Sequence, residues 1–120
     1  ETEESQIWSQ IKELSLANLA SEEPLWRVSV PSNSPLADIS GLQLIDWGGG
    51  LRWYQSSTPE ATFRDAVTSS GGHATLFRGG NRDGDVFQVL PEPLMALQRR
   101  TKEAFDPLGL FNPGRMYAGI

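Results

Sequence analysis

The chain has 120 residues, no cysteine and a formal net charge of −5. This length fits one domain with a sizeable core, and the acidic balance argues against nucleic-acid binding, which needs clustered Lys and Arg. Without cysteine the chain cannot form disulfides, cysteine-ligated zinc sites or iron–sulfur clusters, and no apolar run approaches the roughly 20 residues that span a bilayer.

The first predicted elements are a helix, a strand and a short helix. Ile7, Ile11 and Leu14 share one face of a helix predicted over residues 7–16. Leu25–Val30 is an apolar-rich run flanked by prolines, which is typical of a strand. Ser34 followed by proline is an N-cap with proline at the first helical position, so we predict a short helix that reaches about residue 39.

A hairpin, a helix and a strand follow. Leu42–Trp47 and Leu51–Gln55 are β-prone runs separated by three glycines, which supply the positive φ of a tight hairpin. Thr58 repeats the cap-and-proline pattern and begins a helix that two glycines end at residues 71–72. His73–Arg78 is predicted to be the fourth strand.

From residue 25 to residue 78 the predicted order is strand, helix, strand, strand, helix, strand. This is the order of the ferredoxin-like split βαβ fold, an antiparallel sheet with two helices on one face. We therefore predict the α+β class, with flanking helices at residues 7–16 and 93–105. Val86–Leu90 is a candidate for an extra edge strand.

In such a fold the sheet face without helices is open for function. Because side chains alternate between the faces of a strand, the apolar pattern predicts which residues face inward. The predicted open-face residues are Arg27, Ser29, Arg52, Tyr54, His73, Thr75 and Phe77. The predicted core residues of these strands are Trp26, Val28, Val30, Leu51, Trp53, Ala74 and Leu76. In the second strand two inward sets fit equally well, Leu42 with Leu44 and Ile45 with Trp47. A free-standing domain can carry such a face without any function.

The C-terminal run FDPLGLFNPGRMY, residues 105–117, is the most patterned segment of the chain. The preceding helix is expected to end at Asp106, because proline disfavours helical geometry in the residue before it. Asn-Pro-Gly alone is an ordinary turn sequence. A stiff tail that also carries Arg115 and Tyr117 is a more specific pattern.

This tail resembles the terminus of FAD-linked oxidases of the vanillyl-alcohol oxidase type, especially their 2-hydroxy-acid group. The segments LWRVSVP (25–31), IDWGGGLRWY (45–54) and GHATLFR (72–78) are similar to that family too. Within it, the smaller FAD-binding subunit of bacterial glycolate oxidases is the nearest resemblance.

The resemblance implies that residues 1–120 are a single domain, the C-terminal cap of a longer flavoprotein. The first residue is not methionine, which agrees with an excised segment. FAD would be bound mainly by an N-terminal domain outside this sequence, and residues 106–120 would dock on that domain. Asn112 and Arg115 would then lie near the flavin. The cap would cover the flavin where hydride leaves the substrate, and the fragment alone would be inactive.

The resemblance also implies partners and a location. The partners are a second flavin subunit and an iron–sulfur subunit of a glycolate oxidase, together with a small 2-hydroxy-acid substrate. The location is cytoplasmic, peripheral to the inner membrane through the partner subunits. Because the cap's docking surface would be uncovered, we also expect self-association of the fragment.

Flavin oxidation of a 2-hydroxy acid needs a cation for the carboxylate and a base for the hydroxyl proton. A guanidinium binds a carboxylate bidentately, so Arg27 is the first candidate and Arg52 the second, with Tyr54 beside them. His73, the one histidine, is the candidate catalytic base. The alternatives are a structural hydrogen bond for His73 and a solvated or subunit-facing charge for each arginine.

Other kinds of site are not supported by the sequence. One histidine with scattered carboxylates makes no metal-ligand set, and the glycine pairs and triplets lack phosphate-loop spacing and are expected to form turns. The competing function is a stand-alone ferredoxin-like module that binds a small ligand or another protein.

Overall fold

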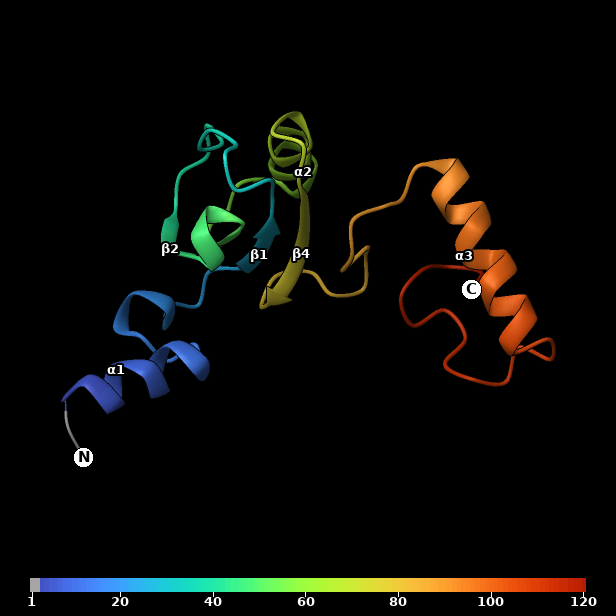
Figure 1. Cartoon of the computed structure of the whole chain (residues 1–120), viewed down its shortest axis with the longest axis horizontal. Coiled ribbons are helices and arrows are strands. Elements are labelled where there is room, and N and C mark those ends of the chain that lie inside the picture. Colours follow the sequence, from blue (N-terminus) through green and yellow to red (C-terminus); the bar gives the residue numbers. More distant parts are fainter. Residues whose placement is uncertain (1–2) are drawn as a thin grey trace. The chain divides into compact units, whose positions relative to one another are not determined.

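The computed structural model describes residues 3–120, which belong to two compact units, Glu1–Asn81 and Arg82–Ile120 (Figure 1). The first unit contains α1 (Glu3–Lys12), η1 (Ala17–Leu19), β1 (Leu25–Ser29), β2 (Leu42–Asp46), η2 (Trp47–Gly49), β3 (Leu51–Gln55), α2 (Glu60–Ser69) and β4 (His73–Arg78). The second contains α3 (Glu92–Phe105) and the C-terminal tail. That the two units act as one domain stays a prediction.

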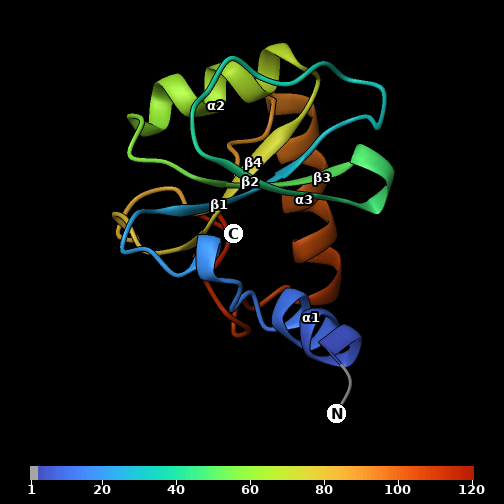
Figure 2. The same cartoon turned by 90° about the vertical axis from the view of Figure 1, so that its left-hand side faces the viewer.

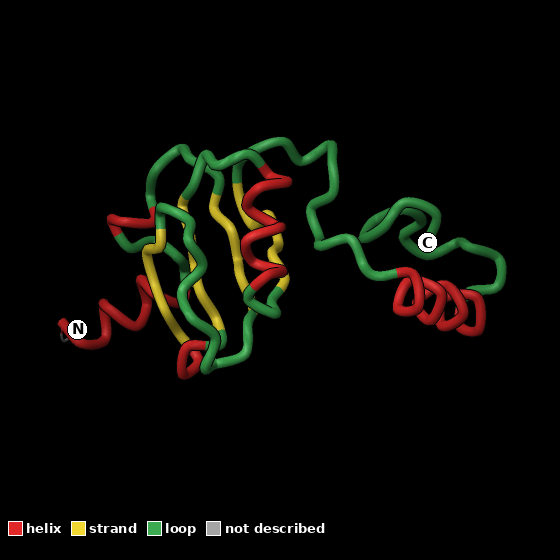
Figure 3. Tube along the Cα trace, turned by 90° about the horizontal axis from the view of Figure 1, so that it is seen from above, coloured by secondary structure: helices red, strands yellow, loops and turns green. Residues whose placement is uncertain are grey.

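The four strands form one antiparallel sheet in the order β2-β3-β1-β4 (Figure 3). This is the strand order of the ferredoxin-like split βαβ fold, so the predicted α+β class is confirmed. β3 and β4 have the predicted bounds, and β1 ends one residue earlier than predicted. The turn between β2 and β3 uses positive φ at Gly48 and Gly49, as the hairpin prediction requires.

The first crossover of the fold is not helical, so the predicted helix over residues 34–39 was wrong. Residues 31–41 contain turns and bends only. The carbonyls of Ser34 and Pro35, which a helix would use, accept hydrogen bonds from the Arg52 guanidinium at 2.6 and 2.7 Å. The Ser34 hydroxyl donates to the carbonyl of Ser70 and caps no helix. The predicted edge strand over residues 86–90 was also wrong, because that segment is irregular.

Helix α2 covers one face of the sheet (Figure 2). Phe63 is its central side chain: it stacks on Trp26 with ring centroids 4.7 Å apart and meets Tyr54 edge-on at 5.7 Å. The core on this side consists of Trp26, Val28, Val30, Tyr54, Phe63, Val67, Ala74 and Leu76. Full burial of each large apolar side chain stabilises the fold by about 1.5–3 kcal/mol. The predicted inward residues of β1 and β4 are therefore confirmed.

Strand β3 presents the opposite faces from those predicted. Tyr54 pairs with Trp26 and Arg52 pairs with Val28, so both lie on the α2 side and the prediction that they face the open side was wrong. Leu51 and Trp53 form a second core on the other side with Leu19 and Leu25. The reason is that the chain supplies a second apolar layer, so apolar side chains are buried on either face.

The segment that precedes β1 forms this second layer. It lies against the sheet face opposite α2 (Figure 2). We call this face, opposite α2, the distal face of the sheet. Leu19 of η1 is fully buried there, and the Gln55 side chain donates to the carbonyls of Leu19 and Ser21 at 3.1 and 3.2 Å. By contrast, α1, which begins and ends earlier than predicted, contains no buried residue.

The open question in β2 is resolved by an irregular register between Leu42 and Leu44. Leu42 pairs with Tyr54 and packs on the α2 side, whereas Leu44 pairs with Trp53 and packs on the distal side. A bulge of this kind breaks the two-residue alternation, so neither predicted set describes the strand.

The closest backbone approach in the sheet predicts a selective loss of stability. A Cβ on Gly41 would lie 1.8 Å from the Gln55 carbonyl oxygen, whereas one on Gly48 would meet nothing within 4 Å. Both glycines have positive φ, so alanine is strained at either position. We expect Gly41→Ala to lower the free energy of unfolding by at least about 2 kcal/mol more than Gly48→Ala in urea titrations. Equal losses would show that the close approach is not present in solution.

Candidate functional site

The distal face brings together polar side chains from β1 and β4. Arg27 pairs with Trp53 on β3 and with Thr75 on β4. Two residues farther along β1, Ser29 pairs with His73 of β4. Directly opposite residues of an antiparallel pair share a face, with Cβ atoms about 4.5–5.5 Å apart. Arg27, Ser29, His73 and Thr75 therefore form one group, called the distal-face cluster below.

Arg27 provides the positive charge of this cluster. Its side chain is partly buried, and within residues 3–120 no hydrogen bond or ion pair engages its guanidinium. A guanidinium has five N–H donors in a planar fork that fits a carboxylate. The geometry thus leaves Arg27 able to bind an anionic group bidentately.

His73 lies at the rim of the cluster, at the first position of β4, and is exposed. Thr75 and Ser29 are partly buried and contribute hydroxyl groups. Phe77 meets Trp53 edge-on with centroids 5.0 Å apart, so an aromatic pair borders the cluster. The alternation of side chains along β1 and β4 predicted that these polar residues share one face of the sheet. It did not predict that Trp53 lies beside them.

Arg52 and Tyr54 are not part of the cluster. Arg52 is 3% exposed, and in addition to the bonds with Ser34 and Pro35 its Nε donates to the Gly49 carbonyl at 3.1 Å. Burial raises the pKa of the Tyr54 hydroxyl above its ordinary value, against the opposing effect of the Arg52 charge. Both side chains stabilise the α2 side of the sheet, and the structure separates them from Arg27 and His73.

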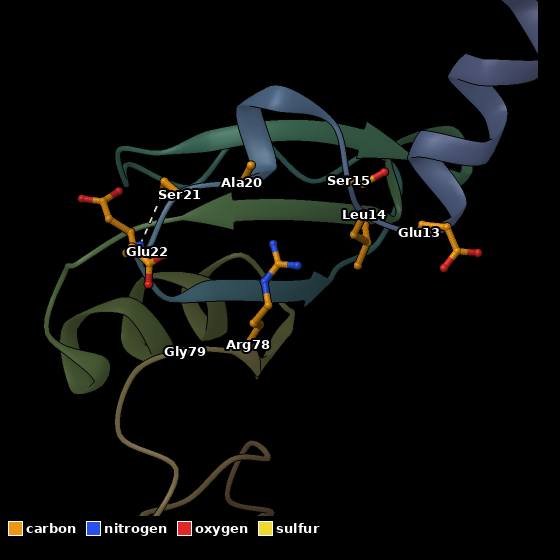
Figure 4. Close-up of a pocket in the computed structure, with 9 residues that line it drawn as sticks. Glu13, Leu14, Ser15, Ala20, Ser21, Glu22, Arg78 and Gly79 are labelled. Atoms are coloured by element: carbon orange, nitrogen blue, oxygen red, sulfur yellow. Dashed lines mark hydrogen bonds between the residues drawn. The ribbon is translucent and has the colours of Figure 1, made fainter.

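A cavity of about 370 Å³ lies beside the end of β4, beneath the segment that covers the distal face (Figure 4). Figure 4 shows the Arg78 side chain reaching toward that segment, where it donates to the carbonyl of Leu19. Glu13, Glu22 and Glu23 line the same cavity. The charges are mixed, and the sequence analysis singled out none of these residues.

In the second unit, the start of the tail is fixed to the end of α3. The Asp106 carboxylate accepts hydrogen bonds from the backbone N–H groups of Leu110 and Phe111, both at 2.9 Å. Lys102 donates to the same carboxylate and to the Phe111 carbonyl. The Lys102 hydrogen bond, followed by those of the two backbone groups, lowers the pKa of Asp106 from 3.8 to about 2.

The two predicted cofactor-binding residues lie farther along this tail. Asn112 is exposed and has a positive φ of 48°, a conformation that asparagine tolerates better than most residues. Arg115 is also exposed, and its backbone N–H donates to the Asn112 carbonyl at 3.2 Å. Gly114 donates to the Ile120 carbonyl at 2.6 Å, so the tail forms a closed loop.

The second unit also exposes a large apolar surface. Phe105, the last residue of α3, is 86% exposed, and the exposed apolar residues of the tail are Leu108, Leu110, Phe111 and Met116. Contiguous exposed apolar surface is one of the features of interaction sites. Among residues 3–120 no helix is long and apolar enough to cross a membrane, and no three acidic or histidine side chains of that range are grouped to hold a metal.

The chain is 44% identical over 115 residues to the glycolate oxidase subunit GlcE of Escherichia coli (strain K12). The similarity covers 96% of this chain and 32% of that relative, so the chain spans about a third of the relative's length. No family model and no solved structure matches. The resemblance to a glycolate oxidase subunit, predicted from the tail and the strand segments, is confirmed.

The Asp106 hydrogen bonds predict an acid-sensitive tail. Because the folded-state pKa lies below 3.8, this carboxylate stabilises the turn fully above about pH 4 and loses the effect as the pH falls through about 2. We expect the amide NMR shifts of Leu110 and Phe111 to titrate together with a midpoint near 2. Asp106→Asn should abolish that transition. A midpoint at the ordinary carboxyl pKa would contradict the assignment.

Proposed function

We propose that residues 1–120 form the substrate-binding cap of an FAD-dependent glycolate oxidase subunit. The observation that carries this proposal is the 44% identity to GlcE over almost the whole chain. In the complete protein the cap covers the flavin at the place where hydride leaves a small 2-hydroxy acid. The distal-face cluster supplies groups of the kind that this reaction needs.

Arg27 holds the substrate carboxylate in this proposal. Arg27 is partly buried, and no hydrogen bond from residues 3–120 uses the donors of its guanidinium, so a carboxylate would gain charge-assisted hydrogen bonds without displacing an acceptor of that part of the chain. Trp53 and Thr75 lie on either side of Arg27 in the sheet. They restrict the space beside the carboxylate, which favours a small hydroxy acid.

His73 accepts the hydroxyl proton at a ring nitrogen. Its side chain is exposed and lies on the same face as Arg27, two residues farther along the β1–β4 pairing, and imidazole is the side chain that most often accepts a proton in enzyme catalysis. FAD, when bound, supplies the hydride acceptor. The work of this chain is to hold the carboxylate, receive the proton and exclude water.

The residues of this chain fit a contact with one edge of FAD. Asn112 and Arg115 offer exposed polar side chains on the closed tail, whereas the chain lacks a glycine-rich pyrophosphate loop. Most of the cofactor is therefore proposed to bind an N-terminal domain, on which residues 106–120 dock. The exposed Phe105, Leu108 and Phe111 support such docking. The further proposed partners are a second flavin subunit and an iron–sulfur subunit.

A stand-alone ferredoxin-like module remains the second candidate function. The 370 Å³ cavity beside Arg78 favours it, since a cavity of this size fits a small ligand. Retention of FAD by a longer protein that includes the proposed N-terminal domain distinguishes the two functions, because a stand-alone module has no need of the flavin.

Substitution of Arg27 tests the proposed substrate site. Loss of one partner of a buried charge pair costs about 2–5 kcal/mol, so Arg27→Ala should lower kcat/KM for glycolate by about 30-fold or more in the assembled oxidase, without loss of flavin. Arg27→Lys should keep part of the kcat/KM that Arg27→Ala loses. Arg100→Ala, at an exposed position of α3, is the control. Near-normal glycolate kinetics of the Arg27→Ala variant would show that Arg27 is a surface charge and does not bind the substrate.

Flavin binding tests whether FAD is bound mainly by the proposed N-terminal domain. Residues 1–120 alone should bind FAD weakly and show no glycolate oxidation, because the pyrophosphate-holding domain is absent. A longer protein that includes that domain should retain FAD through gel filtration, and deletion of residues 111–120 from it should release flavin. Tight FAD binding by residues 1–120 in calorimetry would contradict this arrangement.

A further inference from the structure

Leu14 has a backbone conformation that leucine rarely adopts. Its φ is 50°, in the left-handed region, where a bulky residue is an outlier. Leu14 follows the end of α1, where its own N–H donates to the Ile11 carbonyl at 3.2 Å and the Ser15 N–H donates to the Gln10 carbonyl at 2.9 Å. These two bonds form a Schellman motif, whose left-handed position is usually glycine. The chain therefore has leucine where glycine would be free of strain.

The Leu14 side chain packs on the distal face of the sheet. It is partly buried and lies against the core around Leu19 and Trp53, and Figure 4 shows it over the sheet. The other non-glycine residues with positive φ in the described range 3–120 are Trp47 and Asn112, and both are exposed. Of these three strained residues, Leu14 is the one whose side chain contributes to a core.

That core borders the distal-face cluster directly. Trp53 pairs with Arg27, and Leu51, another member of the core, pairs with Ser29. Directly paired residues have Cβ atoms about 4.5–5.5 Å apart. Leu14 thus packs against the apolar side chains that flank Arg27 and Ser29, on the same face of the sheet.

We infer that Leu14 limits the size of the substituent that a substrate carries on its hydroxyl-bearing carbon. The inference rests on the proposed substrate site, in which Arg27 takes the carboxylate and His73 the hydroxyl proton. The remaining substituent then meets the apolar wall that includes Leu14. The hydrogen atom of glycolate needs no room there, whereas an ethyl group needs space that the leucine side chain occupies.

Kinetics of the assembled oxidase with glycolate and 2-hydroxybutanoate test this inference. Leu14→Gly removes the side chain and relieves the backbone at the same time, so the fold should be kept. We expect the ratio of kcat/KM for 2-hydroxybutanoate to kcat/KM for glycolate to rise by about tenfold or more, because apolar pockets discriminate by about 10–200-fold for one methylene. Leu14→Met conserves the volume and should keep the ratio of the unsubstituted protein.

Leu44→Ala is the matched control. Leu44 is also partly buried and packs against the same core, but it lies on β2, which β3 separates from β1. This variant should lower the free energy of unfolding without a change in the ratio. Circular dichroism and flavin content confirm that each variant is folded and assembled.

Two results would overturn the inference and leave the proposed function intact. One is an unchanged ratio in Leu14→Gly, and the other is an equal rise in Leu44→Ala, which would show a general loosening of the core. Absence of glycolate turnover by the unsubstituted oxidase would instead reject the proposed function and this inference together.

Discussion

The arrangement of the first unit depends on the position of β1 at the centre of a sheet that has an apolar core on each face. β1 pairs with β3 on one side and β4 on the other, and its alternate residues enter two separate cores. A shift of register by one residue would exchange the two faces. Such a shift would move Trp26 and Val28 out of the core against α2 and turn Arg27 into it, so the position of Arg27 on the distal face is fixed by the packing of its neighbours.

Arg52 shows how a charged side chain can serve the fold alone. Its three hydrogen bonds hold the carbonyls of Ser34, Pro35 and Gly49, so one guanidinium joins the crossover after β1 to the turn before β3. A buried guanidinium needs such acceptors, because an unpaired buried charge is costly. Arg27 has no comparable set within residues 3–120. This difference between two arginines on adjacent strands is why only one of them is proposed to bind substrate.

The sequence predicted the strands well because prolines and glycines bound each of them, and the fold class followed from their order. It failed for the crossover helix, since the acceptor carbonyls of residues 34 and 35 are taken by Arg52, which is distant in the chain. It also failed for the faces of β3, because Leu51 and Trp53 find a second apolar layer around Leu19. Arg27 and His73 could be placed by alternation alone.

We propose that the distal-face cluster, with Arg27 at its centre, faces the flavin in the complete oxidase. The most direct test is a crystal structure of that oxidase with FAD and a bound 2-hydroxy acid or unreactive analogue. We expect bidentate hydrogen bonds between the Arg27 guanidinium and the ligand carboxylate, with His73 next to the ligand hydroxyl. A ligand bound elsewhere, with the distal face turned away from the flavin, would contradict it.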